Sequence, residues 1–67
     1  MKPLTAKQVE HILADNGFER GHGKGSHFGW YNPLTKRQTV VPHHGNRVLK
    51  QGTLQEIFRQ AGIPKPR

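Results

Sequence analysis

The sequence contains no cysteine, and only four of its 67 residues are Asp or Glu. The absence of cysteine excludes disulfides, Cys-based zinc sites and thiol nucleophiles, and it is consistent with a reducing compartment. No apolar stretch approaches the ~20 residues of a membrane span, and residues 1–5 lack the hydrophobic run of a signal peptide. We therefore expect a cytoplasmic protein that is not bound to a membrane.

Hydrophobic residues are also scarce, at 31% of the chain. A chain of this length forms one small domain, here spanning residues 1–67, so a cleft between two domains is excluded. Such a domain buries only about 60% of the surface that its unfolded chain exposes. We expect a thin margin of stability.

Positive charge is plentiful, because eleven Lys and Arg residues face four acidic ones and give a formal net charge of +7. The basic residues are spread along the chain instead of forming one tail, so the folded surface should be broadly positive. Such a surface attracts polyanions, nucleic acids among them. The alternative is that the charge serves only solubility, and composition does not decide between the two.

Two segments carry helix signals. Thr5 and Gln8 have the spacing of a capping box, and the sequence Asn16-Gly17 is typical of a helix end, which predicts a helix over roughly residues 6–16. A second helix is expected to begin after Thr53 as its N-cap, with Glu56 completing a capping box, and to end at residues 62–64. The tail from about residue 64 is expected to be flexible.

Strands are predicted between the helices. Five glycines within residues 17–29 indicate tight turns, with room for one short strand at residues 18–20. Further strands are expected at about 26–31, with Phe28 and Trp30 on one face, and at 37–41, stopped by Pro42. The order helix, three strands, helix predicts an α+β fold: a three-stranded antiparallel sheet with two helices on one face.

Histidines are concentrated where carboxylates are rare. His22, His27, His43 and His44 flank the glycine-rich segment or follow the third predicted strand, where Glu19 is the nearby acid. A zinc site made of histidines alone is disfavoured, because no pair has the i, i+4 spacing that would bring ligands together on a helix. A Ser/His/Asp triad is disfavoured too, because neighbouring Ser and His residues point to opposite faces of a strand.

Cleavage of RNA requires fewer groups from the protein than a zinc site or a catalytic triad, because the attacking nucleophile is the 2′-hydroxyl of the substrate itself. The protein must supply a base, cations for the charge that develops on phosphorus, and an acid for the leaving oxygen. His27, Lys24 and a second histidine would suffice, and glycine amides can come close to a phosphate. Trp30 and Tyr31 are candidates for stacking on unpaired bases, although Trp30 is expected to lie partly in the core.

The segment GSH at residues 25–27, preceded by Lys24, is followed by VPHHG at 41–45, KQGTL at 50–54 and IFRQAGI at 57–63. Together with the opening helix that ends in NGF at 16–18, this pattern resembles the HicA-type toxins over nearly the whole chain. The resemblance implies a double-stranded-RNA-binding-domain-like fold with the element order α-β-β-β-α. It also implies a bacterial mRNA interferase, the toxin of a type II toxin–antitoxin system, with a HicB-type antitoxin as partner.

The resemblance places the catalytic histidine of the family on His27, and its glycine and serine on Gly25 and Ser26. His44 is a possible second acid or RNA contact, and Lys24 and Arg47 are expected to bind phosphates. We thus predict an endoribonuclease that acts on mRNA without a metal or other cofactor and is monomeric when free. The alternatives are a non-catalytic RNA-binding module of the same fold and a pure protein-interaction domain.

Overall fold

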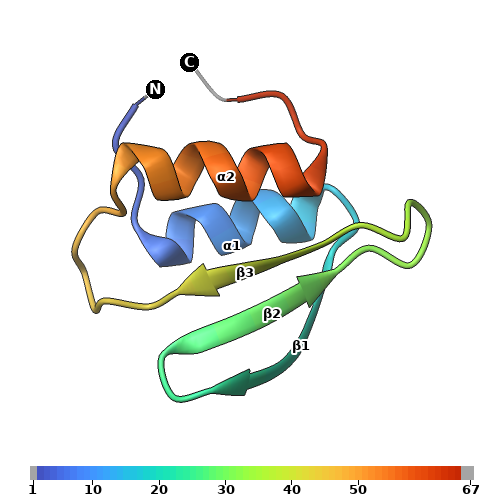
Figure 1. Ribbon diagram of the computed structural model, residues 1–67, viewed down its shortest axis with the longest axis horizontal. Coiled ribbons are helices and arrows are strands. Elements are labelled where there is room, and N and C mark those ends of the chain that lie inside the picture. Colours follow the sequence, from blue (N-terminus) through green and yellow to red (C-terminus); the bar gives the residue numbers. More distant parts are fainter. Residues whose placement is uncertain (1, 66–67) are drawn as a thin grey trace.

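The computed structural model describes residues 2–65 and has the predicted order of elements. These are α1 (Ala6–Asp15), β1 (Glu19–Lys24), β2 (His27–Tyr31), β3 (Gln38–Pro42) and α2 (Gln51–Ala61). The strands form one antiparallel sheet in the order β1-β2-β3 (Figure 1). The predicted α+β fold is confirmed. Residues 66 and 67, the end of the tail predicted from about residue 64, lie outside the described residues.

One face of the sheet is covered by the helices. Along β3, Thr39 and Val41 are buried while Gln38 and Val40 are exposed, which is the alternation of a strand with one covered face. Figure 1 shows both helices against β3, with the β1–β2 hairpin extending away from them. The core consists of Leu4, Ala6, Val9, Leu13, Phe18, Trp30, Val41, Leu49, Leu54, Ile57, Phe58 and Ala61. Within residues 2–65, neither helix has the length and hydrophobicity needed to span a membrane.

Helix α1 begins and ends as its sequence predicts. The Thr5 amide donates to Gln8 Oε1 (2.9 Å) and the Gln8 amide donates to Thr5 Oγ1 (3.3 Å), which completes the capping box. At the other end Gly17 has φ +88°, and the Phe18 amide reaches back to the Leu13 carbonyl at 3.0 Å. Local capping chemistry therefore sets both ends of α1.

The predicted start of α2 is wrong. The helix begins at Gln51 with Lys50 as N-cap and no side-chain capping bond, so Thr53 lies inside the first turn instead of before it. The reason is tertiary: Leu49 is buried, and its amide donates to the Leu4 carbonyl at 2.8 Å. Because this pairing fixes the chain at residue 49, the helix starts directly after it. The predicted end is confirmed, with Gly62 in the left-handed region at φ +69°.

The first strand is longer than predicted, because the glycine-rich segment is mostly strand. β1 continues to Lys24, with a bulge between Arg20 and Gly23 where two residues oppose Gly29 alone. A Cβ atom at Gly23 would lie 2.5 Å from the His27 carbonyl oxygen. The strands therefore pair closely here only because this residue has no side chain.

Gly23→Ala is expected to lower the free energy of unfolding by ~1–3 kcal/mol, because the new methyl group displaces β1 from β2. Gly21→Ala is the matched control, since its Cβ would meet its nearest atom, the Gly29 carbonyl oxygen, at an ordinary 3.6 Å. Urea unfolding of the two variants measures the difference. Equal stability of both variants would contradict the close approach at Gly23.

Candidate active site

The tip of the β1–β2 hairpin brings together four of the residues that the sequence singled out. Lys24 and His27 form the last pair of the ladder, and Gly25 and Ser26 connect them in a two-residue turn. Gly25 has φ +58° at the first position of this turn, as type II′ hairpin turns require. The turn therefore holds a cationic side chain directly opposite an imidazole.

His27 is exposed and lies on the face of the sheet that the helices leave open. Within β2, Trp30 is buried at 8% exposure on the covered face, so His27, Gly29 and Tyr31 alternate with it onto the open face. Lys24 shares this face because it is paired with His27. Of the two aromatic residues proposed to stack on bases, Trp30 is in the core and Tyr31 remains accessible.

The hairpin tip is tied to the rest of the fold through His43. The His43 amide donates to the Ser26 carbonyl at 2.6 Å, which extends the pairing of β2 with the end of β3. The His43 ring is held in turn, with Nε2 2.7 Å from Glu10 Oε1 and an edge contact to Phe28 at a centroid distance of 5.1 Å. The backbone that carries His27 is therefore fixed from α1.

Glu10 is the residue that sequence reasoning missed. Its other oxygen, Oε2, accepts a hydrogen bond from Trp30 Nε1 at 2.9 Å, so one carboxylate joins α1 to two aromatic rings. A signal was present: Glu10 is four residues after Ala6 and three before Leu13, both fully buried, so it lies within the apolar stripe of α1. A carboxylate in that position needs polar partners from the sheet.

His44 and Arg47 lie beside the hairpin tip, not within it. Both are exposed, and they line a hollow of about 420 Å³ between the end of β3 and the start of α2, together with Pro42 and Lys50. His27 is not among the residues that line this hollow. The structure therefore places the predicted residues in two adjoining sets, the hairpin tip and a basic hollow that begins at Pro42, the cross-strand partner of His27.

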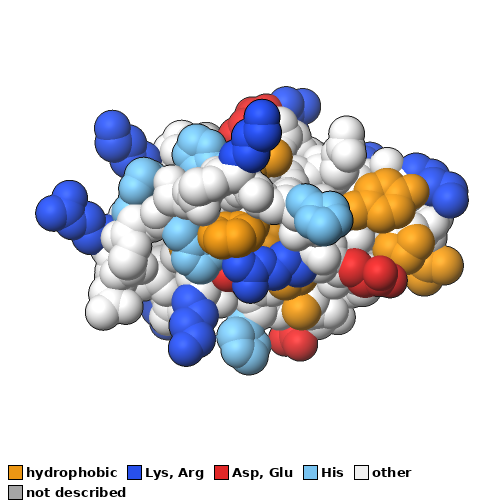
Figure 2. Space-filling view, turned by 90° about the horizontal axis from the view of Figure 1, so that it is seen from below, with side chains coloured by type: hydrophobic (Ala, Val, Ile, Leu, Met, Phe, Trp, Pro, Cys, Tyr) orange, Lys and Arg blue, Asp and Glu red, His pale blue; other side chains and the backbone are white. Residues whose placement is uncertain are grey.

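Positive and titratable side chains dominate the side of the molecule on which β1 lies. Figure 2 shows histidine, lysine and arginine side chains there around a central hydrophobic patch, with a second hydrophobic patch and an acidic group beside it toward the right-hand end. The ion pairs within residues 2–65 are His43 with Glu10 and Arg59 with Glu56, so Lys24 is in neither. The same residues include no group of three or more His, Asp or Glu side chains that could hold a metal ion.

The arrangement can bind an anion at Lys24 and transfer a proton at His27, and a comparison with protein families gives it a context. The family described as HicA toxin of bacterial toxin-antitoxin matches residues 6–63 of the 67. The chain belongs to the HicA toxin family. This confirms the resemblance seen in the sequence, and a HicA toxin has an antitoxin as partner. No curated protein matches this HicA-family chain.

Proposed function

We propose that this HicA-family protein is an endoribonuclease that cleaves mRNA, and so inhibits translation, as the toxin of a type II system. The observation that supports this most is the exposed His27 held opposite Lys24 on an anchored hairpin tip. Imidazole is the side chain that most often transfers protons as a general acid or base. A lysine opposite it supplies the positive charge that phosphoryl chemistry needs.

In the proposed reaction His27 takes the proton of the substrate 2′-hydroxyl. The 2′-oxygen then forms a bond to the adjacent phosphorus, and the bond from phosphorus to the 5′-oxygen breaks. The leaving oxygen gains a proton from a protonated group in the site, which leaves a 2′,3′-cyclic phosphate and a 5′-hydroxyl end. Lys24 and the exposed turn at Gly25 and Ser26 face the charge that develops on the phosphate oxygens. No step in this scheme requires a metal ion.

The basic hollow at His44 and Arg47 is proposed to bind RNA phosphates beyond the cleavage point. Lys50 lines the same hollow, so its charge adds to that of Arg47. Because such contacts are electrostatic, they contribute affinity that falls as salt rises. They position the strand and do not select its sequence.

The antitoxin is proposed to be a HicB-type protein that meets a monomeric toxin in the cytoplasm. A net charge of +7 favours an acidic surface on this partner. Complementary charge speeds association and makes it sensitive to salt.

Analysis of the cleavage products tests the mechanism. The protein is expected to cut a defined RNA into fragments with 2′,3′-cyclic phosphate and 5′-hydroxyl ends, at a rate that EDTA does not change. A substrate with a 2′-deoxy sugar at the cleaved position should remain intact, because it has no nucleophile. Fragments with 5′-phosphate ends, or loss of activity in EDTA that a divalent ion restores, would show metal-assisted hydrolysis instead. RNA that is bound but stays intact would favour the non-catalytic binding module.

A further inference from the structure

A groove begins on the open face of the sheet, the face of His27, and extends past the edge strand β3 to α2. It measures about 680 Å³, and its lining includes Gly21, Gly29, Tyr31, Arg37, Val40 and Arg59. This volume lies within the range of small-ligand sites, so it accommodates a nucleobase and its sugar. The proposed reaction at the hairpin tip makes no use of the groove.

The floor of the groove carries no side chains at Gly21 and Gly29, which leaves the backbone of the sheet accessible there. A Cβ atom at Gly21 would lie 3.6 Å from the Gly29 carbonyl oxygen, and one at Gly29 would lie 3.5 Å from the His22 carbonyl oxygen. Both are ordinary contacts, so the sheet would accept side chains here, in contrast to Gly23. Packing within the protein therefore does not require these two glycines, but a flat ligand lying on the sheet would benefit from them.

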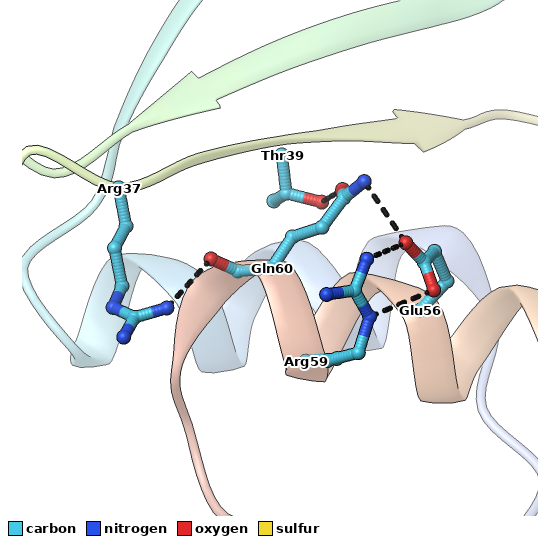
Figure 3. A network of polar contacts seen from close by, with 5 residues as sticks. All are labelled: Arg37, Thr39, Glu56, Arg59 and Gln60. Atoms are coloured by element: carbon cyan, nitrogen blue, oxygen red, sulfur yellow. Dashed lines mark hydrogen bonds and ion pairs between the residues drawn. The ribbon is translucent and has the colours of Figure 1, made fainter.

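The wall of the groove beside α2 supplies positive charge. Figure 3 shows Arg59 paired with Glu56, while Arg37 donates to the Gln60 carbonyl oxygen (Nη1 to O, 3.4 Å). Arg59 holds the pKa of Glu56 below its usual value, first of all through their hydrogen bond, so the charge of this arginine already has a partner within the protein. Arg37 is in neither of the two ion pairs found within residues 2–65. It is the cation of the groove that remains open to an anion.

Arg37 is also held in place. Its side chain crosses the end of α2 so closely that a Cβ atom at Gly62 would lie 2.6 Å from its Nε atom. The left-handed cap at Gly62 thus leaves space for the guanidinium group. A positioned arginine loses less side-chain entropy when it binds a phosphate than a mobile lysine does.

Tyr31 connects the groove with the hairpin tip. It is 40% exposed, and it lies four residues after His27 on the same face of β2, a distance of ~13 Å at ~3.3 Å per residue. Glu19 is the cross-strand partner of Tyr31 on β1. Its negative charge disfavours a phosphate at that position, so we expect the phosphate to bind on the side of the groove that holds the arginines. Tyr31 and Arg37 line the same groove, Tyr31 from the open face and Arg37 from the side of α2. An accessible aromatic ring and a cation in one groove form the pattern by which proteins bind single strands.

We propose that this groove binds the nucleotides next to the cleaved phosphate in single-stranded RNA, with a base stacked on Tyr31 and a phosphate held by Arg37. The inference rests on the proposed ribonuclease function and deepens it by defining where the strand runs. Paired bases are stacked on each other within a duplex, so the Tyr31 contact selects unpaired RNA.

Binding of a 2′-O-methyl RNA oligonucleotide tests the proposal, because this RNA has no free 2′-hydroxyl and stays intact. Fluorescence anisotropy should show about tenfold weaker binding by Tyr31→Ala, or ~1.4 kcal/mol, and nearly unchanged binding by Tyr31→Phe, which keeps the ring. The Tyr31→Ala loss should be absent with a duplex of the same sequence. Equal binding of the single strand by wild type and Tyr31→Ala would overturn the proposal.

Two further variants separate binding from folding. Arg37→Gln should reduce the slope of log K against log salt by about 0.7, whereas Lys7→Gln, which removes the same charge from an exposed position of α1, should not. Gly29→Val should fill the floor and weaken binding about tenfold, while its melting temperature stays equal or rises, because valine favours strands. Unchanged binding by Gly29→Val, or equal slopes for Arg37→Gln and Lys7→Gln, would overturn the proposal.

The two proposals fail in different ways. If His27→Ala still cleaves RNA while Tyr31→Ala binds it weakly, the catalytic assignment is wrong and the groove stands. If His27→Ala is inactive while the Tyr31, Arg37 and Gly29 variants bind like wild type, the groove is wrong and the catalytic assignment stands. Absence of any binding of the 2′-O-methyl strand by the wild-type protein would also overturn the groove proposal.

Discussion

His27→Ala is expected to lower the rate of RNA cleavage by a factor of ~10²–10⁴, the usual contribution of a positioned acid or base. The ring is exposed at the hairpin tip, so its loss removes no core contact. RNA affinity should change little, because Lys24 and the basic hollow around Arg47 remain. Single-turnover cleavage of a labelled RNA measures the rate, and anisotropy with uncleavable RNA measures the affinity.

The control for this variant is His11→Ala, which removes another exposed imidazole, from α1 instead of the hairpin. It should cleave RNA at the wild-type rate. Both variants should melt at the wild-type temperature. Retained cleavage by a folded His27→Ala protein would refute the assignment, and so would equal losses in both variants.

Glu10→Ala is expected to lower the free energy of unfolding by ~2–3 kcal/mol, because it removes two hydrogen bonds to a carboxylate that is only 12% exposed. The Trp30 indole N–H and the His43 ring would lose their partner inside the fold. In a domain of this size the melting temperature should fall by roughly 15–20 °C. Circular dichroism during heating measures it.

Glu19→Ala is the matched control, since it removes an exposed carboxylate from β1 that is in neither ion pair described within residues 2–65. Its melting temperature should stay close to that of the wild type. Glu10→Gln should lie between the two, because its amide oxygen still accepts from the indole while its charge is gone. Equal melting temperatures for Glu10→Ala and Glu19→Ala would show that the contacts of Glu10 do not stabilise the fold.

The elements that could be predicted from the sequence are those that local chemistry determines. The capping box at Thr5 and the glycine at Gly62 act over a few residues, so the start of α1 and the end of α2 were predictable. The start of α2 depends on the pairing of Leu49 with Leu4, 45 positions apart in the numbering. No local pattern contains that information.

In the candidate site, too, local contacts could be predicted from the sequence and tertiary contacts could not. Lys24 and His27 are joined by a two-residue turn, so their proximity could be predicted from neighbouring residues. The contact of Glu10 with His43 spans 33 positions, and it depends on how α1 lies against the end of β3. The groove could not be predicted from the sequence either, because it forms only where residues from all three strands and α2 meet.

The bulge in β1 makes the site depend on residue count. Glu19 and Lys24 pair with Tyr31 and His27 on the same face although five positions separate the two β1 residues, an odd interval that a regular strand would place on opposite faces. A one-residue deletion in the bulge, such as removal of His22, would restore regular alternation. Lys24 would then stay opposite His27, but the extra twist that the bulge gives the hairpin would be lost, which changes the angle at which the tip presents both side chains although neither had been replaced.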